Sequence, residues 1–181
     1  MGDVEDEIFV TTLRDPNAWM QKANGLLAVV AAFDHKIDDA WRDAFVSEIA
    51  RAIVHHTLPV YLMLNAFALE NILKAFIVRM QRAQWTAIKQ IPKELRTHDL
   101  FILSKTAKTQ ATAPAYREEL LRRLSRSSTW YGRYPIPVDS LHLAPTTLSN
   151  QEKRDLSYTT GADVDEIRCL VRDLKAEYLD I

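Results

Sequence analysis

Residues 58–78 read LPVYLMLNAFALENILKAFIV, an apolar stretch nearly as long as a membrane span. Glu70 and Lys74 interrupt it, and each charge costs roughly 2.5–3.5 kcal/mol at the centre of a bilayer. Almost every other position is apolar, so a helix built from this stretch has no polar face to turn toward water. These features predict the central, buried helix of a soluble bundle, from Leu58 to about Arg82, and no membrane association.

The rest of the chain has the composition of one all-α domain. Its 181 residues are 48% hydrophobic and 26% charged, which is typical of a globular chain long enough for a single core. There are only 4 glycines, and most of the 7 prolines fall between periodic segments, which disfavours a many-stranded β architecture. The sequence therefore predicts a flexible N-terminus at residues 1–15 and a single helical domain at residues 16–181.

Apolar residues recur at helical spacing before the central stretch. Asp15 and Pro16 form a helix start, with Asp as the N-cap and Pro at the first helical position. The stripe that follows predicts a helix to about Phe33, and a second stripe predicts another helix over residues 41–56. Pro59 removes a backbone donor, so we expect a kink or a restart of the helix there.

Helices are also predicted after the central stretch. Residues 98–103 have the pattern of a short helix or a docking turn, and residues 116–130 form a longer amphipathic segment. Residues 139–162 are expected to be a polar loop or short helices. The last helix is expected to begin at Asp163, because Glu166 three residues later completes a capping-box pattern.

The sequence points to the cytoplasm and away from cofactor chemistry. Cys169 is the only cysteine and lies in an apolar helical stretch, so we expect a core residue and no disulfide. The acidic N-terminus lacks the apolar region of a signal peptide. There is no glycine-rich phosphate loop, and the adjacent His55 and His56 diverge on a helix, so we expect neither a cofactor nor a metal.

Charge is distributed unevenly along the chain. Residues 79–133 hold 12 Lys and Arg against 4 Asp and Glu, whereas residues 1–78 and 134–181 are both acidic. Arginines interleaved with aromatic residues suit phosphate contacts and base stacking, which makes RNA a candidate ligand. The RNA-binding candidates are Arg122, Arg123, Arg126, Tyr131 and Tyr134. Alternatively, this is an ordinary solvated helix face, on which Glu118 and Glu119 pair with Arg122 and Arg123.

Three short motifs carry the candidate chemistry. Glu70 and Lys74 have the favourable spacing for a helical ion pair, and their apolar flanks predict that the pair is partly buried. Such a pair either stabilises the packing of the helix or takes part in a catalytic or binding site. His98 is a candidate proton-transfer residue, although the adjacent Asp99 is poorly placed to orient it. Arg133 lies in a helix-ending corner, WYGRYP, where it can bridge to a carboxylate or face a phosphate.

The order of these elements resembles the HEPN superfamily over roughly residues 16–135. The resemblance rests on the tryptophan-anchored first helix, ALENILK at residues 68–74, His98-Asp99-Leu100 and the WYGRYP corner at residues 130–135. It implies a bundle of about four or five helices that forms a homodimer. Many members are metal-independent ribonucleases of toxin–antitoxin and other defence systems, and others are non-catalytic modules that bind RNA or a protein partner.

The sequence departs from the superfamily at the expected catalytic dyad. Active HEPN ribonucleases carry Arg-x(4–6)-His in a late helix, with His for proton transfer and Arg on the phosphate. The one match here, Arg51 to His56, precedes the Glu70 helix. Arg133 and His142 lie in the right region but are separated by eight residues. The dyad is therefore absent or built differently, and whether the protein is an enzyme stays open.

Two functions follow from the sequence, and a third option is a purely structural helical protein with no ligand at the Arg133 corner. The first is an RNA-directed protein, a nuclease or former nuclease, with Arg133 on phosphate, His98 in proton transfer, and Glu70 with Lys74 positioning the two. The second is a non-catalytic module whose basic face meets an acidic protein partner or a small anionic ligand. Degradation of RNA in metal-free buffer distinguishes the first from the second.

Overall fold

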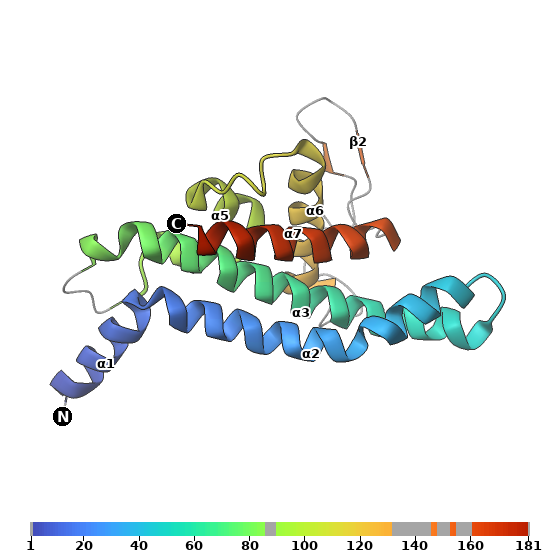
Figure 1. The fold of residues 1–181 in the computed structure, drawn as a ribbon, viewed down its shortest axis with the longest axis horizontal. Helices are drawn as coiled ribbons and strands as arrows, with labels where there is room; N and C mark the ends of the chain where they lie inside the picture. Colours follow the sequence, from blue (N-terminus) through green and yellow to red (C-terminus); the bar gives the residue numbers. More distant parts are fainter. Residues whose placement is uncertain (1, 86–89, 132–145, 148–152, 155–160, 181) are drawn as a thin grey trace.

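The computed structural model describes residues 2–85, 90–131, 146–147, 153–154 and 161–180, and it confirms the all-α fold (Figure 1). Within these ranges there are seven α-helices instead of the expected four or five, because α1 and the one-turn α4 add to the long helices. In chain order the elements are α1 (Gly2–Arg14), α2 (Pro16–Asp43), α3 (Glu48–Gln81), the 3-10 turn η1 (Arg82–Gln84), α4 (Lys93–Arg96), α5 (Leu100–Ala107), α6 (Ala115–Arg126), the π-helical η2 (Ser127–Tyr131), β1 (Thr146–Thr147), β2 (Lys153–Arg154) and α7 (Gly161–Leu179).

Helix α3 is the central element of the bundle, as predicted. Helix α2 runs along one side of it, and α5, α6, η2 and α7 contact the remaining sides (Figure 1). By length and composition α3 is apolar enough to cross a membrane, but 72% of its most apolar window is buried inside the protein. The side chains that fill the core from α3 include Leu62, Leu69, Ile72, Leu73, Phe76 and Ile77.

The two long helices extend further than the sequence predicted. Helix α2 does not end near Phe33, because Ile37 and Ala40 continue its buried face to Asp43. Pro59 lies inside α3 and does not restart it, so residues 48–81 form one helix. A proline in a helix costs about 3 kcal/mol. Burial of neighbouring side chains such as Leu58 and Leu62 offsets that cost.

Residues 2–14 form helix α1, within the N-terminal segment that the sequence predicted to be flexible. In α1, Phe9 and Leu13 lie one helical turn apart and pack against the core, and this packing stabilises the short helix. The indole Nε1 of Trp19 donates to the Leu13 carbonyl at 3.1 Å and closes the corner. The predicted start of the next helix is confirmed, since Asp15 caps α2 and Pro16 begins it.

The C-terminal helix begins earlier than predicted. Helix α7 starts at Gly161, so Asp163 is not its N-cap and the capping-box prediction is wrong. Asp163 pairs instead with Arg123, and Glu166 with Arg117, which tie α7 to α6. Two short antiparallel strands, β1 and β2, also lie within the predicted polar loop. One face of α7 packs into the core through the buried residues Val164, Ile167, Leu170, Leu174 and Tyr178.

One polar cluster joins α2, α3 and α7. The Tyr61 hydroxyl donates to Asp34 Oδ1 at 2.7 Å, and Arg168 reaches the same oxygen at 3.0 Å and Asp38 at 2.9 Å. Burial and the hydrogen bond to Asp34 raise the pKa of Tyr61 to about 12. This pKa exceeds that of an unfolded tyrosine, which is about 10. The protonated phenol therefore stabilises the fold fully below about pH 10, and this contribution is lost as the pH rises through the pKa of the folded protein.

We therefore predict a stability loss between about pH 10 and pH 12 that depends on Tyr61. Tyr61→Phe cannot ionise, so it should lose less stability than the wild type over this interval. Urea unfolding at several alkaline pH values measures the effect. Tyr116→Phe, on an exposed tyrosine, is the matched control and should follow the wild type. Identical alkaline losses in the wild type and Tyr61→Phe would contradict the prediction.

Candidate functional site

Glu70 and Lys74 form a buried ion pair in the middle of α3. Lys74 Nζ lies 2.6 Å from Glu70 Oε1, and the two residues are only 4% and 6% exposed. The spacing of four residues places both side chains on the same helical face. The Lys74 ammonium also lies 5.8 Å from the ring centroid of Trp19, within the range of a cation–π contact. The predicted partial burial is therefore exceeded, and the pair is almost fully removed from water.

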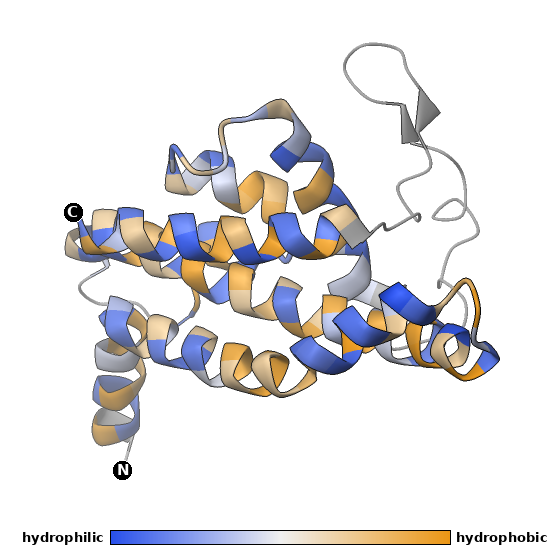
Figure 2. Ribbon diagram, turned by 45° about the vertical axis from the view of Figure 1, so that its right-hand side comes forward, coloured by the Kyte–Doolittle hydropathy of each residue, from blue (hydrophilic) through white to orange (hydrophobic). Residues whose placement is uncertain are grey.

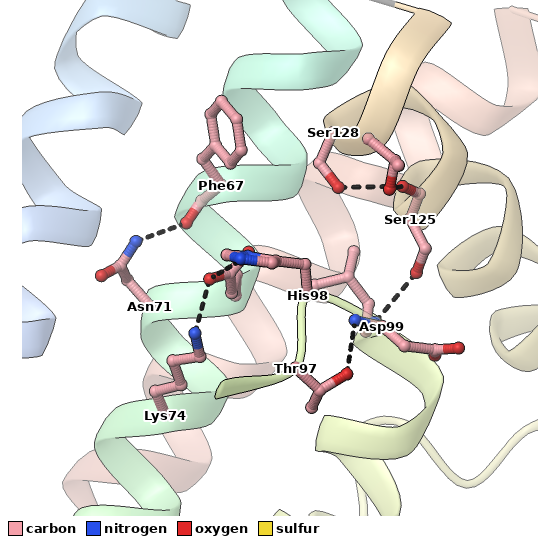
Figure 3. Close-up of polar contacts among 11 residues, drawn as sticks. Phe67, Asn71, Lys74, Thr97, His98, Asp99, Ser125 and Ser128 are labelled. Carbon is pink, nitrogen blue, oxygen red and sulfur yellow. Dashed lines mark hydrogen bonds and ion pairs between the residues drawn. The ribbon is translucent and has the colours of Figure 1, made fainter. Parts of the chain in front are cut away.

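His98 contacts this pair from outside the helix (Figure 3). Its Nδ1 lies 3.0 Å from each of the two Glu70 carboxylate oxygens. In contrast to its partners, the His98 side chain is 69% exposed. The structure therefore brings together three of the four residues predicted to be catalytic, and His98 is the one that meets solvent.

Backbone contacts on both sides hold His98 in place (Figure 3). The Asp99 amide donates to Thr97 Oγ1 at 3.1 Å, and the Leu100 amide donates to Ser125 Oγ of α6 at 2.9 Å. Asp99 itself caps α5 by accepting from the Ile102 amide at 3.0 Å. As expected for an adjacent residue, Asp99 is thus engaged elsewhere and does not orient His98. The carboxylate that does so is Glu70.

The geometry fixes which nitrogen of His98 is free. A carboxylate paired with an ammonium accepts hydrogen bonds, so the contact with Glu70 places a proton on Nδ1. A neutral ring then carries its lone pair on Nε2, the nitrogen that makes no contact with Glu70.

The predicted RNA-binding arginines are largely occupied by contacts within the protein. Arg122 pairs with Glu118 at 3.0 Å, and its guanidinium carbon lies 3.9 Å from the Phe101 ring centroid. Arg123 contacts Glu119 at 4.0 Å and pairs with Asp163 of α7. Both Glu–Arg pairs anticipated for an ordinary helix face are therefore present. Arg126 is half-buried and also has a contact within the protein.

Arg117, in the same basic segment, has a structural role. Arg117 is buried and binds Glu166 at 2.6 Å, Asp173 at 2.7 Å and the Ala111 carbonyl. The hydrogen bond from Arg117 lowers the pKa of the Asp173 carboxyl. These contacts join α6 to α7. The positive charge of Arg117 therefore stabilises the packing of these two helices.

The remaining predicted site residues lie outside the described residues. Arg133, Tyr134 and His142 are not described, nor is the side chain of Tyr131. The chain enters this region from η2, which packs against α3. A π-helical turn is uncommon and often occurs at a functional site. The role of Arg133 on phosphate stays a prediction from the sequence.

Several contributors to the site were not predicted. Trp19 was assigned only to the core stripe of its helix, yet its ring also lies against Lys74. Thr97 and Ser125 hold the backbone around His98, and neither belongs to a motif. The only available signal was that Thr97 stands just before the His98-Asp99 motif, a common position for a hydroxyl that caps a turn.

The comparisons with known proteins do not identify the site. Among the described residues, no three His, Cys, Asp or Glu side chains gather as a candidate metal site. The chain matches no protein-family model, and no curated protein or solved structure is significantly similar to it. The resemblance to the HEPN superfamily therefore stays an interpretation of the sequence.

Proposed function

We propose that this protein is an RNA-directed, HEPN-like domain that cleaves RNA without a metal ion, using His98 for proton transfer. The observation that supports this most is the contact between Nδ1 of His98 and the buried Glu70–Lys74 pair, while Nε2 of this exposed imidazole has no hydrogen bond within the described part of the chain. A buried carboxylate that orients a histidine is a recurrent arrangement in proton-transfer sites. A purely structural pair has no need of an exposed histidine.

The proposed reaction is an internal transesterification of RNA. His98 Nε2 takes the proton of a 2′-hydroxyl, and the resulting oxygen attacks the adjacent phosphorus. The bond from phosphorus to the 5′-oxygen breaks, and this oxygen takes a proton from the protonated His98 or from water. The products are a 2′,3′-cyclic phosphate and a new 5′-hydroxyl. Arg133, on this proposal, stabilises the negative charge on the phosphate oxygens.

The surroundings of the site are compatible with this chemistry. Glu70 holds the ring orientation through Nδ1, so the reaction needs no reorganisation of His98. Lys74 is buried and acts through Glu70, so it is a positioning residue and does not touch the substrate. A homodimer and a role in defence are further parts of the proposal that rest on the resemblance alone.

We predict that the protein cleaves a single-stranded RNA in buffer that contains EDTA. The same oligonucleotide with 2′-deoxyriboses should remain intact, because the nucleophile is missing. Separation of end-labelled products, with analysis of the termini for cyclic phosphate, measures both results. Cleavage of both oligonucleotides would contradict the mechanism. Binding of RNA without cleavage would remove the enzyme and leave a binding module.

The alternative, a non-catalytic interaction module, is favoured by one observation. The tip of the α2–α3 hairpin carries Phe45, Val46 and Ile49, which are 89%, 87% and 76% exposed. In the ribbon of Figure 2 the loop at this tip is coloured hydrophobic, between hydrophilic ends of the two helices. Solvent-exposed apolar clusters often mark contacts with other proteins. If the RNA is neither bound nor cut, this function is the better account.

A further inference from the structure

A pocket of about 420 Å³ lies where α1 crosses the bundle. It is lined by α1, by the first turns of α2, by Asn71 of α3 and by Ile91. This volume falls within the range of about 300–1,000 Å³ that is typical of small-molecule sites. Figure 1 shows α1 turning away from α2 at its end, so the pocket occupies the corner between them.

The lining of this pocket combines an apolar wall with few polar groups. Phe9, Leu13, Trp19 and Ile91 provide aromatic and aliphatic surface. Asn71, also in the lining, is held by a hydrogen bond from its Nδ2 to the Phe67 carbonyl at 2.7 Å. An apolar pocket with a few convergent polar groups is the usual form of a site that orients a small ligand.

A single cation is present in the lining. Among the described residues that line the pocket, Lys22 is the only one with a charge, and it has no ion pair within the described part of the chain. Helix α1 also carries Glu5 and Glu7 just before the lining residue Ile8, and carboxylates there disfavour a polyanion. A nucleic acid, with a charge on every phosphate, is therefore a poor occupant. A ligand with one negative charge suits the lining.

We propose that this pocket binds an apolar monocarboxylate, with its hydrocarbon or aromatic body against Trp19 and Phe9 and its carboxylate at Lys22. The apolar body gains from burial against the lining, and the ammonium provides a charge-assisted contact. Asn71 points toward α2, on a different side of α3 from His98 (Figure 3). The pocket shares the Trp19 ring with the Lys74 contact, but His98 and Glu70 do not line it, and its test does not depend on RNA cleavage.

Calorimetric titration of the full chain with decanoate, below its micelle-forming concentration, tests this proposal. We expect saturable binding at one site. Lys22→Met should weaken it by about tenfold, equivalent to about 1.4 kcal/mol. Lys36→Met removes an exposed lysine from the same helix outside the lining, and it should bind like the wild type. Decanol, which lacks the charge, should bind the wild type about as weakly as decanoate binds Lys22→Met.

A second pair of variants locates the ligand. Ala18 lines the pocket, so Ala18→Leu should fill part of it and reduce binding, whereas Ala28→Leu, outside the lining of the pocket, should not. Circular dichroism verifies that each variant is folded. Absence of decanoate binding to the wild type would overturn the proposal. Equal binding by all variants, or equal binding of decanoate and decanol to the wild type, would also overturn it.

Discussion

Replacing Glu70 by alanine is expected to lower the free energy of unfolding by about 3–5 kcal/mol. The substitution leaves the Lys74 ammonium in a site that is only 4% exposed, without the carboxylate that lies 2.6 Å from it. A buried charge without a partner costs far more than the net worth of the pair, because the desolvation is no longer compensated. Urea unfolding followed by circular dichroism measures the loss.

Two matched variants separate this explanation from a general intolerance of the site. The double substitution Glu70→Leu with Lys74→Met removes both charges and keeps similar volume, so its stability should be near that of the wild type or above it. Asp39→Ala breaks the exposed pair with Arg42 and should cost about 1 kcal/mol or less. A double variant as unstable as Glu70→Ala would show that the buried charge is not the cause.

The central helix was predictable because its evidence is local. A long apolar run with two charges four residues apart defines a buried helix and an ion pair on one face, and both are present. The ends of the helices depended on more distant contacts. Pro59 was expected to interrupt the helix, but burial of its neighbours outweighed the local preference. Helix α1 likewise depends on contacts of Phe9 and Leu13 with the core.

The sequence predicted which residues belong to the candidate site, but not how they contact one another. Sequence patterns selected Glu70, Lys74 and His98, and the fold places them in contact. The partner of His98 is Glu70, which is 28 residues away, and a contact at that separation has no local signature. Conversely, the charge of Arg122 and Arg123 suggested RNA, whereas Asp163 of the distant α7 and the nearby glutamates engage these side chains.

Replacing His98 by alanine is expected to reduce the rate of RNA cleavage by about 10²–10⁴-fold, the usual contribution of general acid–base catalysis. The fold should tolerate the change, because the side chain is 69% exposed and Glu70 keeps its contact with Lys74. We expect a stability change of about 1 kcal/mol or less, the net worth of a typical hydrogen bond. His35→Ala, on an exposed histidine of α2, is the matched control.

The central claim is that His98, held by the buried Glu70–Lys74 pair, transfers protons during RNA cleavage. Its most direct test compares the RNA cleavage rates of the wild type, His35→Ala and His98→Ala in one buffer that contains EDTA. The wild type and His35→Ala should cut the end-labelled RNA at the same rate, and folded His98→Ala should have lost almost all activity. Equal rates for His98→Ala and the wild type, or no cleavage by the wild type, would contradict the claim.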